Sequence, residues 1–160
     1  MVGVFGCILR DGNVAPVIYE ALKKLEHRGY DSVGAATIHE GNIHSGKDQG
    51  KIDDVYARYR MDSFPGRVGI GHLRWATHGA PLQMNAHPHL DCNGNVAVAQ
   101  NGIIENYAEI KRELELAGHV FRSRTDTEVV PHLIEERLKK GLRFEDALRE
   151  TLNRLEGSFS

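Results

Sequence analysis

The chain has 160 residues, which is enough for one globular domain and too few for two complete catalytic domains. Apolar residues make up 41% of it and charged residues 26%, which excludes extensive disorder, and a net charge of −2 removes the usual electrostatic basis for binding nucleic acid or an anionic membrane. No apolar run approaches the roughly 20 residues that span a bilayer, no basic and apolar leader opens the chain, and two cysteines fit a reducing compartment. We therefore expect a cytoplasmic protein without a nucleic-acid or membrane partner.

The first half of the chain alternates between strand and helix patterns. Short apolar runs predict strands over residues 1–10, 32–39 and 67–73. Apolar residues at helical spacing predict helices over residues 14–25 and 52–59. Residues 74–94 form a long segment rich in His, Asn, Pro and Gly, and a loop of that length in a small domain is usually functional.

The second half is predicted to be mostly helical. Residues 95–100 resemble a strand, and Asn106 with Glu109 has the pattern of a capping box at the start of a helix. Apolar residues at helical spacing predict three helices, over residues 107–117, 127–140 and 144–155. Residues 157–160 resemble the start of a strand. The whole pattern indicates a mixed α and β fold, and no repeat or composition shift marks a second domain.

Polar residues gather where predicted strands end. Residues 72–79, HLRWATHG, follow a strand, and loops leaving strands commonly carry sites. Arg74 is a candidate for binding a carboxylate, because a guanidinium offers two parallel donors. The RGYDS sequence at 28–32 stands at a similar junction, but it equally fits a helix stop followed by a turn.

The histidines at positions 72, 78, 87 and 89 raise the question of a metal site. Two of them belong to the sequence NAHPH at 85–89. No HExxH or CxxC pattern accompanies them and few carboxylates lie nearby, so hydrogen-bonded structural histidines are the favoured interpretation. We therefore predict no metal ion and no cofactor.

Two further polar sequences each have two interpretations. Asn101-Gly102 is a strong signal for a type I′ hairpin turn, but a helix start follows instead of a returning strand. The alternative is an oxyanion hole, in which a side-chain amide and a glycine N–H donate to a developing negative charge. Residues 125–128, TDTE, fit simple helix capping, or an Asp126 carboxylate placed to bind a substrate ammonium group.

Five sequences in a fixed order together resemble one known family. They are RGYDS at 28–32, RWATHG at 74–79, NAHPH at 85–89, NGIIEN at 101–106 and TDTEV at 125–129. Their order and spacing resemble the glutaminase domain of glucosamine-6-phosphate synthases (glutamine–fructose-6-phosphate aminotransferases), which is a class II glutamine amidotransferase domain. The resemblance covers residues 1–160 without a large gap.

The resemblance implies a fold, a reaction and partners. The fold is the N-terminal-nucleophile fold, a four-layer α/β/β/α sandwich, of which residues 1–160 are expected to be the N-terminal portion, incomplete at the C-terminal end. The reaction is hydrolysis of L-glutamine to L-glutamate, with the ammonia used to make glucosamine 6-phosphate from fructose 6-phosphate. The partner is then a sugar isomerase domain, absent from this chain, and the resemblance allows a homodimer.

The resemblance also assigns roles to single residues. Asn101 and Gly102 would form the oxyanion hole, Arg74 would bind the α-carboxylate of glutamine, and Asp126 would bind its α-ammonium group. The remaining residues would line the pocket, in the case of Trp75, Thr77 and His78, or support it, in the case of Arg28 and His89.

One departure from the family concerns the attacking atom. The family begins Met-Cys-Gly and removes the methionine, so that a cysteine thiolate attacks the amide and its own α-amine acts as the base. Here Val2 occupies the nucleophile position, and its isopropyl group cannot attack. Cys7 cannot substitute, because its nitrogen is a peptide amide; we expect it to be a small buried apolar residue. We therefore expect this chain to be inactive or impaired as a glutaminase.

Two other functions stay open. The first alternative is a non-catalytic module that senses glutamine or acts as a scaffold for a sugar isomerase partner. The second, given less weight, is a histidine-rich metal protein.

Overall fold

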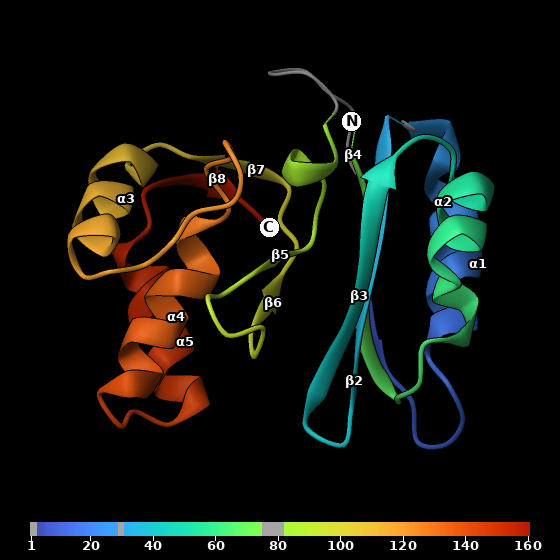
Figure 1. The fold of residues 1–160 in the computed structure, drawn as a ribbon, viewed down its shortest axis with the longest axis horizontal. Helices are drawn as coiled ribbons and strands as arrows, with labels where there is room; N and C mark the ends of the chain where they lie inside the picture. Colours follow the sequence, from blue (N-terminus) through green and yellow to red (C-terminus); the bar gives the residue numbers. More distant parts are fainter. Residues whose placement is uncertain (1–2, 29–30, 75–81) are drawn as a thin grey trace. The chain divides into compact units, whose positions relative to one another are not determined.

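The computed structural model describes residues 3–28, 31–74 and 82–160, and the chain divides into two units (Figure 1). Unit 1 comprises Met1–Pro88 and Ala99–Asn101, and unit 2 comprises His89–Val98 and Gly102–Ser160. Each unit has its own hydrophobic core. The uniform composition of the sequence did not indicate this division.

Unit 1 is built on a four-stranded antiparallel sheet in the order β1-β4-β2-β3. Its strands are β1 (Gly3–Ile8), β2 (Ser32–His39), β3 (Asn42–Gln49) and β4 (Val68–Arg74). In the register of the central pair, Ser32 lies opposite Arg74. The last residue of β4 is therefore held at the edge where β2 begins.

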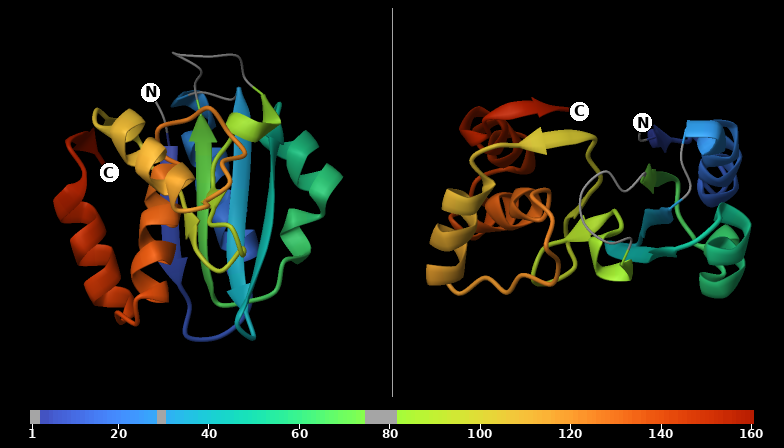
Figure 2. Two further views of the ribbon diagram at one scale, coloured as in Figure 1. Left: turned by 60° about the vertical axis from the view of Figure 1, so that its left-hand side comes forward. Right: turned by 90° about the horizontal axis from the view of Figure 1, so that it is seen from above.

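Helices α1 (Ala15–Leu25) and α2 (Ile52–Tyr59) cover one face of this sheet (Figure 2). Their apolar sides form the core with residues of β2 and β4. Close packing of α1 needs a glycine in β4: a Cβ added to Gly71 would lie 2.4 Å from Cγ2 of Ile18. The 3₁₀ turns Glu26–Arg28, Met61–Ser63 and Gln83–Asn85 join these elements.

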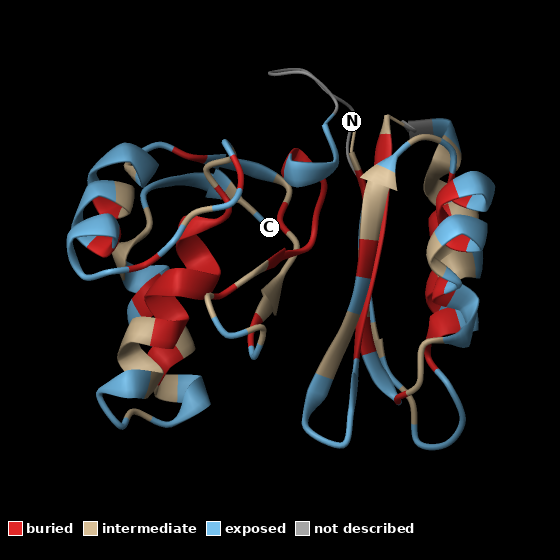
Figure 3. Cartoon of the chain, in the orientation of Figure 1, coloured by how far each residue is buried: buried red, intermediate tan, exposed pale blue. Residues whose placement is uncertain are grey.

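Unit 2 combines three helices with two short antiparallel ladders. The helices are α3 (Tyr107–Leu116), α4 (Val129–Lys139) and α5 (Phe144–Arg154). The ladders are β5 (His89–Leu90) with β6 (Ala97–Val98), and β7 (Gly102–Ile104) with β8 (Gly157–Phe159). Helix α4 is buried over its first two turns and forms the centre of the second core (Figure 3).

Most predicted elements are confirmed, and several predictions need correction. Strand β3 was not predicted, and the strand expected over residues 95–100 contracts to Ala97–Val98. The segment 74–94, predicted as a loop, contains β5. The hairpin interpretation of Asn101-Gly102 is wrong, because the strand that begins at Gly102 pairs with β8 and not with β6.

The capping box predicted at Asn106 is also wrong. The side chain of Asn106 makes no cap hydrogen bond to α3. Its Nδ2 donates to the carbonyl oxygen of Arg154 at 2.9 Å, and its Oδ1 accepts from the backbone N–H of Glu156 at 3.1 Å. Asn106 therefore joins the start of α3 to the segment that enters β8.

Among the described residues, no helix has the length and apolar character needed to cross a membrane.

Candidate active site

In unit 1, the side chain of Asn101 is held by a buried histidine at the end of β4. His72 Nε2 lies 2.8 Å from Asn101 Oδ1 and 3.2 Å from the carbonyl oxygen of Gln100. Both neighbours are oxygen acceptors, so Nε2 carries the proton and donates it. The bond engages the oxygen of the Asn101 amide and so fixes which way the amide group is turned.

His72 stays neutral in the physiological range. Burial, with a smaller contribution from the nearby Arg74 guanidinium, lowers the pKa of His72 to about 4, although the Asn101 and Gln100 hydrogen bonds oppose the shift. The imidazole of His87 stacks on it, with ring centroids 4.2 Å apart and planes 16° apart. His72 is therefore a neutral donor that orients Asn101.

This neutral histidine predicts a loss of stability in acid. The pKa of His72 is about 4 in the folded chain and 6.5 in the unfolded chain, so between those pH values the unfolded state binds more protons. The free energy of unfolding should therefore fall as the pH drops from 6.5 to 4, by up to about 3 kcal/mol from this residue alone. Urea unfolding at several pH values would measure it. The His72→Gln variant should lack this component, and equal acid sensitivity in both proteins would contradict the assignment.

The segment before Pro88 is fastened to the sheet of unit 1. Lys47 on β3 donates through Nζ to the carbonyl oxygens of Ala86 at 2.7 Å and Pro88 at 2.9 Å. The His87 carbonyl approaches β2 so closely that a Cβ on Gly34 would lie 2.0 Å from its oxygen. His87 Nδ1 accepts the backbone N–H of Gln100 at 3.2 Å. The NAHP segment therefore fixes the backbone just before Asn101.

Arg74, predicted to bind a carboxylate, is the last residue of β4 and is half-buried. Its carbonyl oxygen accepts the backbone N–H of Asp31 at 3.1 Å. This bond extends the pairing of β4 with β2 by one residue. Arg74 is thus on rigid backbone in the same unit as Asn101.

In unit 2, Gly102 has a backbone that only glycine adopts easily. Its φ is +127°, and a Cβ at this position would lie 2.1 Å from the carbonyl oxygen of Ser158 in β8. The pairing of β7 with β8 therefore requires glycine here, independently of any role in an oxyanion hole.

Asp126 also lies in unit 2 and contacts β7. Its Oδ2 accepts the backbone N–H of Ile104 at 2.7 Å, so its side chain does not cap α4 as the simpler interpretation expected. Helix α4 begins at Val129, after Glu128. This hydrogen bond holds the Asp126 carboxylate beside β7, the strand that starts at Gly102.

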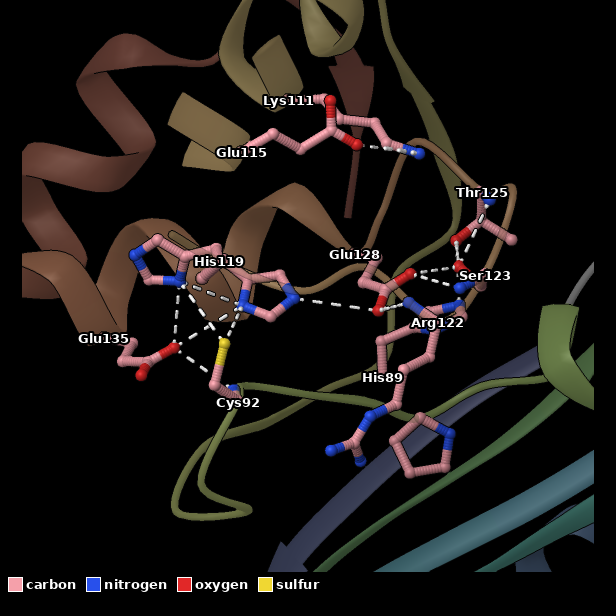
Figure 4. Close-up of polar contacts among 12 residues, drawn as sticks. His89, Cys92, Lys111, Glu115, His119, Arg122, Ser123, Thr125, Glu128 and Glu135 are labelled. Atoms are coloured by element: carbon pink, nitrogen blue, oxygen red, sulfur yellow. Dashed lines mark hydrogen bonds and ion pairs between the residues drawn. The ribbon is translucent and has the colours of Figure 1, made fainter. Parts of the chain in front are cut away.

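A chain of hydrogen bonds shapes the loop that carries Asp126 (Figure 4). His89 Nε2 lies 2.9 Å from Thr125 Oγ1, which lies 3.0 Å from Ser123 Oγ. Ser123 Oγ donates to Glu128 Oε2 at 2.6 Å, and the backbone N–H groups of Arg122 and Ser123 donate to the same carboxylate at 2.7 Å. Burial would raise the pKa of Glu128, but His132 and these donors outweigh it and lower the pKa to about 2. His89 therefore acts on the loop through Thr125.

Several predicted residues lie outside the described part of the chain. These are Val2, Trp75, Thr77 and His78, and the side chain of Arg28. Cys7 is described: it lies in β1, is half-buried and packs against the core of unit 1.

The region from residue 72 to residue 160 matches the family of glutamine amidotransferase domains. The chain belongs to this family. Isomerizing glutamine–fructose-6-phosphate aminotransferases are similar to it along its whole length: those of Methanothermobacter thermautotrophicus and Pyrococcus horikoshii are 54% identical, and that of Mesorhizobium japonicum is 48% identical. The chain spans 26–27% of the length of these relatives.

Two solved structures have the same fold as this glutamine amidotransferase domain. Glutamine phosphoribosylpyrophosphate amidotransferase from B. subtilis, solved with ADP and GMP, is 28% identical with a TM-score of 0.77 over 99% of this chain and 33% of that one. A second structure, of the allosteric regulatory enzyme of purine biosynthesis, is 31% identical with a TM-score of 0.80 over 99% and 34%. The expected α+β class and N-terminal-nucleophile fold are confirmed.

Sequence reasoning missed the residues that orient the predicted ones in this glutamine amidotransferase domain. His72 and His87 were predicted to be hydrogen-bonded structural histidines, but their partners, the Asn101 side chain and the backbone of Gln100, were not predicted. Lys47 was not singled out at all. His72 precedes Leu73 and Arg74 at the end of a predicted strand, and this position could have indicated that His72 supports the site.

Proposed function

We propose that this glutamine amidotransferase domain binds L-glutamine through the residues that the sequence singled out. Arg74 binds the α-carboxylate, Asp126 binds the α-ammonium group, and Asn101 with the Gly102 N–H binds the side-chain carbonyl oxygen. Trp75, Thr77 and His78 line the pocket, while Arg28 and His89 support it.

The observation that carries the proposal is the hydrogen bond from His72 to Asn101. A neutral, buried histidine donates to the amide oxygen, so the amide must present its NH₂ group to whatever it binds. A donor fixed in advance is what a developing oxyanion requires, because no reorganisation is needed when the charge appears. The Arg74 guanidinium and the Asp126 carboxylate have the charges that complement the two charged groups of an α-amino acid.

We further propose that hydrolysis by this chain is weak because of Val2. Attack on the amide carbon needs a nucleophilic atom and a base, and valine has neither in its side chain. Binding of glutamine uses other residues and is retained. A module that senses glutamine without hydrolysing it is the second candidate, and the identity of Val2 is what favours it.

The relatives indicate the larger setting. They are isomerizing glutamine–fructose-6-phosphate aminotransferases. We propose that residues 1–160 are the N-terminal portion of the glutaminase domain of such an enzyme, which works with a sugar isomerase domain in making glucosamine 6-phosphate. We place the protein in the cytoplasm, in line with its unpaired cysteines, and retain a homodimer as a proposal.

Titration calorimetry with L-glutamine tests the binding site. We expect saturable heat at millimolar ligand, and an Arg74→Ala variant should bind about 10–100-fold more weakly, because a hydrogen bond to a charged group contributes about 1.5–3 kcal/mol. Arg67→Ala is the matched control, since Arg67 stands just before the opposite end of the same strand and donates to the Arg10 carbonyl oxygen. If neither the unmodified protein nor Arg74→Ala produces heat, the domain is a scaffold and the proposal is wrong.

A further inference from the structure

Four side chains of unit 2 bring together sulfur, nitrogen and oxygen atoms of the kinds that bind metal ions. They are Cys92, His119, His132 and Glu135, and their ligand atoms all lie within 4.8 Å of one another. Cys92 lies in the turn between β5 and β6, and His119 follows Gly118 at the end of α3. His132 and Glu135 are three residues apart on α4. Figure 4 shows Cys92, His119 and Glu135 pointing toward one another from these different segments.

Five of the six separations among the four ligand atoms are close to the edges of a tetrahedron around a metal ion, and all six are within 4.8 Å. His119 Nδ1 lies 3.3 Å from His132 Nδ1, and Cys92 Sγ lies 3.6 and 3.5 Å from these two nitrogens. Glu135 Oε2 lies 3.1 Å from His119 Nδ1 and 3.4 Å from His132 Nδ1. For zinc bonds of about 2.05 Å to nitrogen and about 2.3 Å to sulfur, the tetrahedral edges are about 3.3 Å between nitrogens and about 3.6 Å from nitrogen to sulfur.

The outer nitrogen of each histidine faces a carboxylate. His119 Nε2 lies 3.1 Å from Glu136 Oε2, and His132 Nε2 lies 3.6 Å from Glu128 Oε1. Histidines that bind metals commonly give their second N–H to a carboxylate, which fixes the tautomer. With the protons on Nε2, both Nδ1 atoms direct lone pairs at the same point.

The two carboxylate oxygens of Glu135 have different surroundings: one binds side chains outside the cluster, and the other faces the two histidines. Its Oε1 binds Lys139 Nζ at 2.8 Å and Asn93 Nδ2 at 2.9 Å, while Oε2 faces the two histidines and accepts the Cys92 backbone N–H at 3.1 Å. The Lys139 ammonium group and the Cys92 N–H both favour the anionic form of this carboxylate. An anionic oxygen and two nitrogen lone pairs at 3.1–3.4 Å repel one another unless a cation or added protons lie between them.

We propose that Cys92, His119, His132 and Glu135 bind one divalent transition-metal ion of the zinc class in a closed tetrahedral site. The mixed thiolate, imidazole and carboxylate set suits Zn²⁺, whereas Mg²⁺ and Ca²⁺ prefer oxygen alone. Four protein ligands leave no position for substrate, and both histidines and Glu135 are at most 4% exposed, so the site is structural. This proposal replaces the expectation of no metal, and it does not depend on the proposed glutamine site.

The ion would tie together three segments of unit 2 that are far apart in sequence. It joins the β5–β6 turn and the end of α3 to α4. Glu128, which faces His132, is also the carboxylate that holds the loop preceding α4. Binding requires the Cys92 thiol to lose its proton, so metal affinity should increase with pH.

The test measures the metal content of the purified protein that contains this chain. Elemental analysis should find one zinc per chain, and Co²⁺ added to the chelator-treated protein should give the visible bands of a tetrahedral thiolate complex. A Cys92→Ser variant should lose the thiolate band and stoichiometric zinc. Cys7→Ser is the matched control, because it removes the other cysteine, which lies in unit 1, and should keep both signals.

A second variant guards against misfolding of Cys92→Ser. Glu136→Gln keeps all four ligands. It changes the partner of His119 and removes an ion pair with the exposed Lys140, so it should fold and should bind zinc about 10–100-fold more weakly. Chelation should lower the Tm of the unmodified protein by several degrees, and added Zn²⁺ should restore it. The proposal is overturned if the unmodified protein, kept reduced at neutral pH, binds neither Zn²⁺ nor Co²⁺, or if Cys92→Ser retains the unaltered cobalt spectrum.

Discussion

Replacing Val2 with cysteine and exposing it by removal of Met1 should raise the rate of glutamine hydrolysis by about 10⁶-fold, the cost of losing the nucleophile in another covalent hydrolase. That factor corresponds to about 8 kcal/mol of activation free energy. The added thiolate supplies the atom that attacks the amide carbon, and the free α-amine, with an ordinary pKa of about 7.7–8.0, accepts a proton near neutral pH. Glutamate release from glutamine measures the effect.

A matched control separates the two parts of this change. Val2→Cys with Met1 retained contains the thiol, but its nitrogen lies in a peptide bond and cannot act as the base, so most of the gain should be absent. Cys7→Ser in the active background should change nothing, because Cys7 packs against the core of unit 1. Rapid glutamate release by the unmodified chain would show that Val2 does not disable hydrolysis.

Asn101→Ala in the Val2→Cys background should lower kcat by about 10²–10³-fold, the usual cost of removing one oxyanion donor. KM should change little, because the donor acts mainly when negative charge develops on the oxygen. His72→Gln should cause a smaller loss, since it removes the group that orients Asn101 and leaves the donor itself in place. Steady-state glutaminase kinetics of the three proteins would measure both effects.

Asn101→Asp distinguishes an oxyanion donor from a merely structural residue. Aspartate has nearly the same shape and can still accept the His72 N–H, but it offers a carboxylate where the amide offers N–H donors. It should therefore be as inactive as Asn101→Ala while keeping the stability of the unmodified chain. If Asn101→Ala retained full kcat, Asn101 would have no role in the oxyanion hole.

The elements that could be predicted are those whose sequence pattern reflects their burial. Helices α1 and α3 each bury one apolar side, so their spacing was sufficient to find them. Helix α5 was found by the same spacing, although two residues of its predicted apolar side, Phe144 and Leu152, are exposed. Strand β3, NIHSGKDQ, is mostly polar and has only one fully buried residue, Gly46. Its pairing with β2 is what makes it a strand, and that information lies in another segment.

The sequence singled out the polar residues now proposed for the site, and not the residues that orient them. Arg74 and Asn101 were singled out because they follow predicted strands, and Asp126 because it precedes a predicted helix. The candidate metal ligands Cys92, His119 and His132 were missed because they are far apart in the sequence. Cys92 and His119 are 27 residues apart, and His119 and His132 are 13 residues apart. Only His132 and Glu135 lie close together in the sequence. A His and a Glu three residues apart on a helix are common in proteins that bind no metal ion there.

The pairing of β7 with β8 has a consequence during protein synthesis. Unit 1 obtains all four strands of its sheet by residue 74, so its sheet can form early on the ribosome. Strand β7 has to wait for β8, which follows about 50 residues later, and at ~5–20 residues per second this takes several seconds. Until Gly157–Phe159 emerges, the strand that begins at Gly102 has unpaired backbone groups and is open to a wrong partner. The segment directly after Asn101 therefore reaches its final conformation later than the sheet of unit 1.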